Sequence, residues 1–269
     1  MYDCESEPTH LSENIIAIVQ ARMGSSRLPG KVLENICDRP MLEWVIQRAK
    51  KSTRISQLVV ATTAKDEDDI LEKYCRLHAI PIFRGSSADV LDRYVQAGRK
   101  FYAGVIVRLT ADCPFIDPEL IDQTLAVFFQ TGVDFAANRL PPPYVRTFPI
   151  GLDVEVVSMP ALEKAWCESK ALFEREHVMP YIYQHPDLFK IKIINHEVDY
   201  GTYRWTVDTR EDLEFIRSVA VLLGCRMDFS WLDIIKLLKK HPELAKMNVQ
   251  VKPKSLMDVD EREKPGRER

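Results

Sequence analysis

The sequence predicts an α/β fold with a mostly parallel central sheet and helices on both of its faces. Short apolar segments, typical of buried strands, alternate with longer amphipathic segments, typical of helices, through the first half of the chain. The chain has 269 residues, and 46% of them are hydrophobic, which is enough to fill a substantial core. We expect one folded domain over 14–251, preceded by a flexible segment at 1–13.

Strand and helix alternate regularly up to residue 139. The first strand, NIIAIVQ, is a short apolar run that ends at a turn-rich stretch. We expect strands at 14–20, 57–62, 80–83, 104–110 and 133–139. The helices between them are expected at 41–50, 66–78, 88–102 and 118–130, the last beginning at Pro118 because proline suits a first helical turn.

The alternation breaks at residue 140, where the proline-rich loop PPPYVRTFPIG begins. A loop without periodicity is expected here to rim a site. Beyond it we expect strands at 152–157, 189–195 and 205–208 and helices at 158–168, 173–184, 209–224 and 229–241. From Lys252 onward, eleven of eighteen residues are charged and none is aromatic, so 252–269 is expected to be a disordered tail.

The charge balance and the chain ends exclude several classes of protein. Lys and Arg number 37 against 40 Asp and Glu, whereas nucleic-acid binding usually leaves a basic excess. No apolar run approaches the roughly 20 residues of a membrane helix, and the N-terminus is acidic where a secretory signal is basic. We therefore expect a soluble cytoplasmic protein without nucleic-acid or membrane partners.

The cysteines have no spacing typical of a metal site or a redox motif. The six lie at positions 4, 37, 75, 113, 167 and 225. A chain of this length has core enough without covalent cross-links, so we expect reduced thiols. Cys113 is expected to be a packing residue rather than a nucleophile.

The loop that follows the first strand, VQARMGSSRLPGK, combines small residues with cations. Small residues let a backbone turn closely around an anion, and Arg22, Arg27 and Lys31 bring three cations to the same loop. At the C-terminal end of a strand this combination predicts a polyphosphate site. It is not the P-loop of ATPases, because Lys31 is followed by Val32 instead of Ser or Thr, and because Pro29 disfavours a helix that begins directly within the loop. The alternative is a solvated basic turn.

Two aspartates stand at the ends of later strands. Asp112 lies in VRLTADCPFID, and Asp208 ends RWTVD. Mg²⁺ on a nucleoside triphosphate is usually held by one or two carboxylates plus phosphate oxygens, so Asp112 and Asp208 are candidate metal ligands. The alternative is that each caps a turn or a helix, as we expect of Asp117.

Six motifs together resemble one known family. ARMGSSRLPGK, FRGSSADVLDRY, RLTADCPFID, GLDVEVV, EREHVMPYI and RWTVDTREDLE occur in this order over roughly 15 to 235. They are similar to the spore-coat-polysaccharide cytidylyltransferase-like family, which is related to acylneuraminate and ketodeoxyoctulosonate cytidylyltransferases. The resemblance implies a nucleotide-diphospho-sugar transferase fold and a nucleotidyltransferase domain at 14–251.

The resemblance also implies roles for individual residues. Arg22 and Lys31 would bind the triphosphate and act in catalysis, with support from Arg27, while Asp112 and Asp208 would hold Mg²⁺. The complete nucleotide site would consist of Ala21, Arg22, Gly24, Ser25, Arg27, Lys31, Ser86, Asp89, Arg93 and Asp112. For two of these an alternative stays open, because Asp89 could be a helix cap and Arg93 a surface charge.

The acceptor would bind farther along the chain, at Arg108, Glu155, Glu176 and His177. We expect Asp153 and Glu155 to point to opposite faces of a strand, so that at most one faces the site, and we favour Glu155. The amphipathic helix that carries Glu176 and His177 could equally be a lid or a subunit contact.

The predicted reaction is attack of an acceptor oxygen on the α-phosphorus of a nucleoside triphosphate, with release of pyrophosphate. The resemblance implies CTP as the nucleotide, Mg²⁺ as the cofactor, a sugar acid, sugar phosphate or related acceptor, and a homodimer. One alternative enzyme is a glycosyltransferase that uses a ready-made nucleotide sugar. A non-catalytic nucleotide-binding protein is a second alternative.

Overall fold

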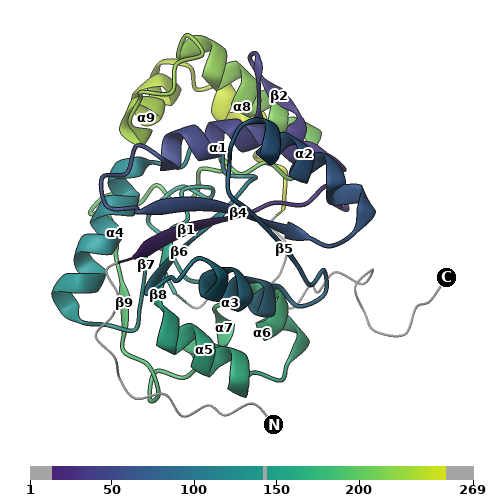
Figure 1. Cartoon of the computed structure of the whole chain (residues 1–269). Helices are drawn as coiled ribbons and strands as arrows, with labels where there is room; N and C mark the ends of the chain where they lie inside the picture. Colours follow the sequence, from purple (N-terminus) through teal and green to yellow (C-terminus); the bar gives the residue numbers. More distant parts are fainter. Residues whose placement is uncertain (1–13, 142–143, 253–269) are drawn as a thin grey trace.

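A seven-stranded sheet runs through the middle of the computed structural model, which describes residues 14–141 and 144–252 (Figure 1). In spatial order its strands are β5 (Ile82–Gly85), β4 (Gln57–Thr63), β1 (Ile15–Gln20), β6 (Val105–Thr110), β8 (Glu155–Ser158), β7 (Phe135–Ala137) and β9 (Ile191–Ile193). Only β8 runs antiparallel to its neighbours β6 and β7, and the other pairs are parallel. The predicted mostly parallel sheet is therefore confirmed.

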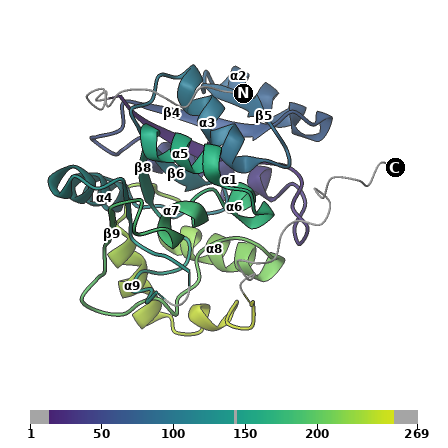
Figure 2. The same ribbon diagram turned by 90° about the horizontal axis from the view of Figure 1, so that it is seen from below.

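Helices cover both faces of the sheet, as expected (Figures 1 and 2). One face carries α1 (Met41–Ala49), α2 (Asp69–Leu77), α4 (Pro118–Thr131), α8 (Arg210–Leu222) and α9 (Trp231–Lys240). The other carries α3 (Val90–Lys100), α5 (Met159–Glu168), α6 (Leu172–His177) and α7 (Pro180–Gln184). Short 3₁₀ turns at Lys31–Leu33, Asp66–Asp68 and Leu244–Lys246 and a small hairpin of β2 (Asn35–Ile36) and β3 (Arg39–Pro40) complete the regular structure of the described residues.

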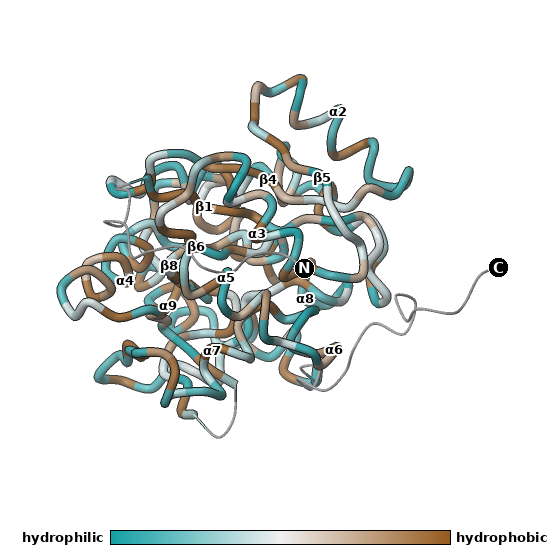
Figure 3. The backbone as a smooth tube through the Cα atoms, turned by 60° about the horizontal axis from the view of Figure 1, so that its bottom comes forward, coloured by the Kyte–Doolittle hydropathy of each residue, from teal (hydrophilic) through white to brown (hydrophobic). Residues whose placement is uncertain are grey.

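Each face of the sheet has its own core. Trp44, Phe115 and Phe215 are buried in the first, and Tyr94 and Phe135 in the second. The strands between the two cores are apolar, whereas the outer turns of the helices are mixed or polar, as the hydropathy colours of Figure 3 show. A strand that is buried on both sides reads as a continuous apolar run, which explains why β1 and β6 were predictable.

Two predicted elements differ from those in the structure. Residues 205–208 form no regular strand, because Trp205 N–H donates to Ile150 O and Val207 N–H donates to Asp112 O, so the segment has two different neighbours and no continuous ladder. The helix predicted at 173–184 is divided into α6 and α7. Val178, with φ of 74°, ends the first, and Pro180 begins the second.

The prediction of reduced thiols is wrong for Cys37, Cys225 and Cys167, which are all disulfide-bonded. Cys37, in the turn between β2 and β3, forms a disulfide with Cys225, which follows α8 and lies 188 positions away in the sequence. Spacing rules detect near neighbours only, and the fold brings these two Cα atoms to 6.1 Å. Cys113 is buried, and burial raises the pKa of its thiol, which fits a packing residue.

The two predicted flexible ends, 1–13 and the tail beyond Lys252, lie outside the described residues. Lys252 itself is described and belongs to the folded part of the chain. Across the described ranges, no helix is both long and apolar enough to span a bilayer.

Candidate active site

The loops that follow β1 and β6 meet at one edge of the sheet. The two strands are parallel neighbours in register, with Gln20 opposite Thr110, so both end at the same place. Ala111 N–H donates to Gln20 O and continues the pairing into the second loop. The C-terminal ends of parallel strands are where open α/β sheets bind ligands. The predicted polyphosphate loop and Asp112 are therefore neighbours because of strand order.

The polyphosphate loop has a defined shape. Met23 O accepts hydrogen bonds from the N–H groups of Ser25 and Gly30, both at 2.9 Å, and Gly30 adopts a φ of 73°, which favours glycine. The fully buried carboxylate of Asp68 accepts a hydrogen bond from Met23 N–H at 2.7 Å and so holds the loop in place. At Gly24, an added Cβ would lie 2.6 Å from Oε1 of Glu67, the end of an exposed side chain that can move aside.

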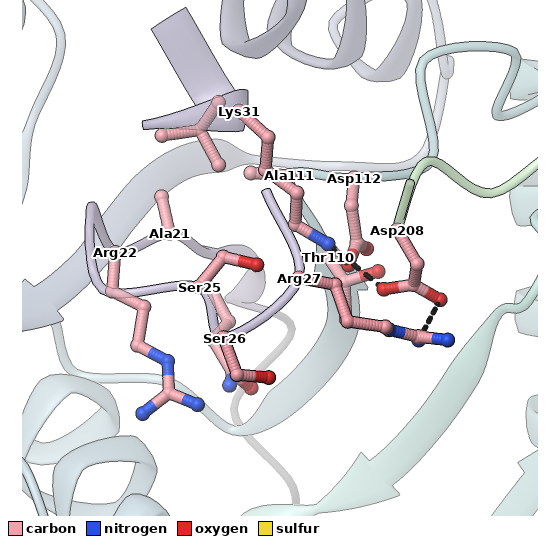
Figure 4. A pocket seen from close by; sticks show the side chains of 12 residues that line it. Ala21, Arg22, Ser25, Ser26, Arg27, Lys31, Thr110, Ala111, Asp112 and Asp208 are labelled. Carbon is pink, nitrogen blue, oxygen red and sulfur yellow. Dashed lines mark hydrogen bonds and ion pairs between the residues drawn. The ribbon is translucent and has the colours of Figure 1, made fainter. Parts of the chain in front are cut away.

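Lys31 joins the two aspartates that the sequence singled out. Its Nζ donates to Asp112 Oδ2 at 2.7 Å, to Asp208 Oδ1 at 3.0 Å and to Val207 O at 2.6 Å (Figure 4). Arg27 Nη2 lies 2.7 Å from Asp208 Oδ2. The loop after β1, the loop after β6 and the segment before α8 thus converge on one cluster of charges.

The cluster shifts the titration of its members. Burial opposes the charged form of Lys31, but Asp112 and Asp208 outweigh it and raise the pKa of the ammonium. Burial likewise disfavours the Asp208 carboxylate, yet Lys31 and Arg27 lower its pKa to about 2. Lys31 and Asp208 are therefore both charged at neutral pH.

A cavity of about 170 Å³, the loop cavity, lies above this cluster. Of the predicted residues, those that line it are Ala21, Arg22, Ser25, Arg27, Lys31, Asp112 and Asp208. Gly24 is not among them. In Figure 4, Arg22 lies on the opposite side of the cavity from Asp208, so cations flank the space from two directions.

A second cavity of about 90 Å³, the small cavity, adjoins the first through Arg22 and Gln20. Three residues predicted to bind the acceptor, namely Arg108, Glu176 and His177, line it together with Ser87 and Ala88. The structure therefore places Glu176 and His177 beside the polyphosphate loop. Lining a cavity fits a binding role for them, although a lid would occupy the same place.

Besides Gly24, three residues predicted to bind the nucleotide line neither the small cavity nor the loop cavity. Asp89 caps α3 by accepting Asp92 N–H at 2.8 Å, and it pairs with Arg175 Nε at 2.9 Å. Ser86 Oγ accepts Asp89 N–H, and Arg93 donates to Ser86 O. The cap interpretation therefore fits Asp89. Arg93 is 1% exposed, so neither a surface charge nor a direct nucleotide contact fits it.

The third cavity, the large cavity, has a volume of about 830 Å³ and shares Arg27, Thr110, Asp112 and Asp208 with the loop cavity. Glu155, Arg108 and His177 line it, as predicted. Arg108 pairs with Glu155 across β6 and β8, whose register places the two residues opposite each other.

The expectation that only one of Asp153 and Glu155 faces the site is wrong. Both line the large cavity. Residues two positions apart on an extended chain point to the same side, so the assignment to opposite faces misapplied the strand period. Asp153 also precedes β8, which begins at Glu155.

The sequence patterns did not reveal three arginines of the large cavity, Arg139, Arg146 and Arg204. Arg146 Nη1 lies 2.6 Å from Asp153 Oδ1, and Arg139 Nε lies 3.1 Å from Asp153 Oδ2. Burial disfavours the charged Asp153, but these two arginines outweigh it and lower its pKa. Arg146 could have been predicted from the sequence, because it lies in the proline-rich loop that we expected to rim a site. In all, the cavity is lined by the arginines Arg27, Arg108, Arg139, Arg146 and Arg204 and by the acidic residues Asp112, Asp153, Glu155 and Asp208.

Comparison with known proteins identifies the family. Residues 16–252 match the family described as cytidylyltransferase. The chain belongs to the cytidylyltransferase family. The predicted resemblance over roughly 15 to 235 is thereby confirmed and extends to Lys252.

Individual members of the cytidylyltransferase family agree with this membership. The spore coat polysaccharide biosynthesis protein SpsF of Bacillus subtilis is 37% identical over 240 residues, which are 86% of this chain and 97% of SpsF. The 3-deoxy-manno-octulosonate cytidylyltransferase of Acidobacterium capsulatum is 33% identical over 132 residues, 48% of this chain and 52% of that protein. The solved structure of a cytidylyltransferase from Leptospira borgpetersenii superposes on this chain with a TM-score of 0.79 at 33% sequence identity. The superposition covers 90% of this chain and 98% of the Leptospira chain.

Proposed function

We propose that this cytidylyltransferase transfers a cytidylyl group from CTP to an anionic sugar-type acceptor and releases pyrophosphate. The observation that carries the proposal is the arrangement of the loop cavity and the large cavity. They share Asp112 and Asp208, so a triphosphate in the first would present its phosphorus atoms to an acceptor in the second. Family membership and the names of the relatives support CTP and a sugar acceptor.

The chemistry needs no covalent intermediate. An acceptor oxygen forms a bond to the α-phosphorus, the bond from that phosphorus to the bridging oxygen of the β-phosphate breaks, and the electron pair leaves with pyrophosphate. Arg22 and Lys31 would offset the charge that spreads over the phosphate oxygens as this happens. In the described structure the three donors of Lys31 Nζ are taken by Asp112, Asp208 and Val207, so a direct bond to a phosphate oxygen requires the ammonium to release one of these acceptors.

Mg²⁺ fits the residues present. Both Asp112 and Asp208 contact the single ammonium of Lys31, so two carboxylates already converge on one cation. Oxygen ligands suit Mg²⁺, which usually takes one or two carboxylates and completes its shell with phosphate oxygens and water. Asp112 and Asp208 would hold the ion, and the ion would neutralise phosphate charge.

The acceptor would occupy the large cavity. Its five arginines exceed its four acidic side chains by one, and Arg139 and Arg146 share a single carboxylate, Asp153. This local excess of positive charge favours an acceptor that carries a carboxylate or a phosphate. The cytosine ring would lie toward the small cavity, which adjoins Arg22.

The direct test is a pyrophosphate-release assay with Mg²⁺, the four nucleoside triphosphates and a panel of neutral and acidic sugars. We expect release with CTP and an acidic sugar, no release after chelation of divalent ions, and loss of most turnover in Asp112→Asn and Asp208→Asn with the fold intact. A higher kcat/KM for a purine nucleotide would overturn the choice of base. Transfer from a ready-made nucleotide sugar without pyrophosphate would establish the glycosyltransferase instead, and nucleotide binding without turnover would establish a non-catalytic protein.

A homodimer and a cytoplasmic location complete the proposal. Light scattering coupled to size-exclusion chromatography would measure the oligomeric state. The Cys37–Cys225 disulfide is of a kind that is rare in reducing compartments, so the location needs its own measurement by fractionation of the source cells.

A further inference from the structure

The last described part of the chain returns to the candidate active site. Residues 244–252, the C-terminal segment, begin with the 3₁₀ turn Leu244–Lys246. At its end, Lys252 O accepts a hydrogen bond from Arg27 Nη1 at 3.2 Å. Arg27 belongs to the polyphosphate loop, so the C-terminal segment touches the site directly at this point.

Asn248 is the buried polar residue of the C-terminal segment, with an exposed fraction of 4%. Its side-chain amide Nδ2 donates to Arg204 O at 3.0 Å and to Asp212 Oδ1 at 2.9 Å. A cavity of about 500 Å³ is lined by residues 201–205 on one side and by parts of the C-terminal segment on the other. These two hydrogen bonds attach the middle of the segment beside this cavity, while Leu244 attaches its start by packing into the core.

Both acceptors of the Asn248 amide hold Asp208 in place. Arg204 Nη2 donates to Asp208 Oδ2 at 2.7 Å, while Arg204 Nε donates to Asp212 Oδ1 at 2.9 Å. Asp212, which is fully buried, also accepts the backbone N–H of Asp208 at 2.9 Å through Oδ2. Asp212 thus fixes the main chain of Asp208, and Arg204 fixes its carboxylate.

We infer that Asn248 is a positioning residue that fixes the Asp208 carboxylate through Arg204 and Asp212, so that the C-terminal segment is part of the active site. Its effect on turnover rests on the proposed function. Without the amide, a buried carbonyl and a buried carboxylate oxygen each lose a donor, and Arg204 loses the restraint on its backbone. A displacement of about 1 Å at a group that orients reactants costs on the order of 100-fold in rate.

The test compares Asn248→Ala and Asn248→Leu with a matched control. Asn248→Leu keeps approximately the shape of the side chain and removes the donor without adding a charge beside Asp212, so it replaces the alanine variant if that variant folds poorly. The control is Asn14→Ala. Asn14 Nδ2 also donates two hydrogen bonds, both at 2.9 Å, to Phe101 O and Tyr102 O, but it precedes β1 at the opposite edge of the sheet from the site.

We expect both Asn248 variants to lower kcat by about 10- to 100-fold with KM for CTP changed less than about threefold. The Asn14→Ala control should show a decrease in melting temperature comparable to that of the Asn248 variants and should keep the kcat of the wild type. Crystal structures of wild type and Asn248→Ala should show the Asp208 carboxylate displaced from Arg204 and Lys31 in the variant.

A carboxylate that stays in place in the variant crystal, or a kcat that falls no further than in the control, overturns the inference. The crystallographic comparison holds whatever reaction the enzyme catalyses. If wild type released no pyrophosphate, the proposed function would fail, and the position of Asp208 in the variant would still decide the role of Asn248.

Discussion

Lys31 links the fold to the proposed chemistry. Its ammonium is held by two carboxylates and one carbonyl, and its side chain is 9% exposed. Removing it leaves Asp112 and Asp208 facing each other without their shared cation, which destabilises a buried site. Arg22 differs, because it lines the loop cavity and the small cavity on the side away from those aspartates.

Alanine variants should separate these two roles. Arg22→Ala is expected to weaken CTP binding by roughly 1.5 to 3 kcal/mol, the value of a charge-assisted contact, with little change in melting temperature. Lys31→Ala is expected to lose a similar amount of affinity and to melt at a clearly lower temperature as well. Isothermal titration calorimetry and thermal melting measure the two effects. Arg39→Ala, which removes an arginine that pairs at 3.6 Å with Glu43, is the control. Unchanged CTP affinity in Arg22→Ala would refute its role.

Among the elements, the C-terminal segment gives the clearest prediction. The sequence predicts a disordered tail from Lys252 onward, whereas in the structure Lys252 O accepts a hydrogen bond from Arg27. The folded part of the chain therefore includes Lys252. A chain truncated after Lys252 keeps both Asn248 and that carbonyl, so we expect melting temperature and kcat to match the full-length protein. Truncation after Met247 removes both contacts and should abolish most turnover. A loss of activity in the longer truncation product would show that residues beyond Lys252 contribute.

For the molecule as a whole, the Cys37–Cys225 disulfide links parts of the chain that are 188 positions apart. Closing a loop of that length in the unfolded chain contributes up to about 5 kcal/mol in the chain-entropy account. The double variant Cys37→Ser/Cys225→Ser is therefore expected to melt at a substantially lower temperature. Peptide mapping by mass spectrometry under non-reducing conditions should find the cross-link in wild type. Equal melting temperatures would mean that the bond contributes no stability.

The amino-acid sequence alone determined the features that depend on near neighbours. The apolar runs of β1, β4 and β6 and the first-turn proline of α4 follow from local period and stereochemistry, and so does the polyphosphate loop with its small residues and cations. Lys31, Asp112 and Asp208 were also predicted as neighbours, because each follows the C-terminal end of a strand in the sequence, and the structure brings the three into contact.

Only the tertiary structure decided which distant residues share a site. Arg146 reaches Asp153 from a loop without periodicity, and Asn248 reaches Arg204 across 44 positions of sequence. The pairing of Cys37 with Cys225 likewise depends on how α8 packs against the β2–β3 hairpin. Local patterns carry no record of these contacts, because each is formed when separate elements bury their apolar faces on a common sheet, and the geometry of that packing is a property of the whole chain.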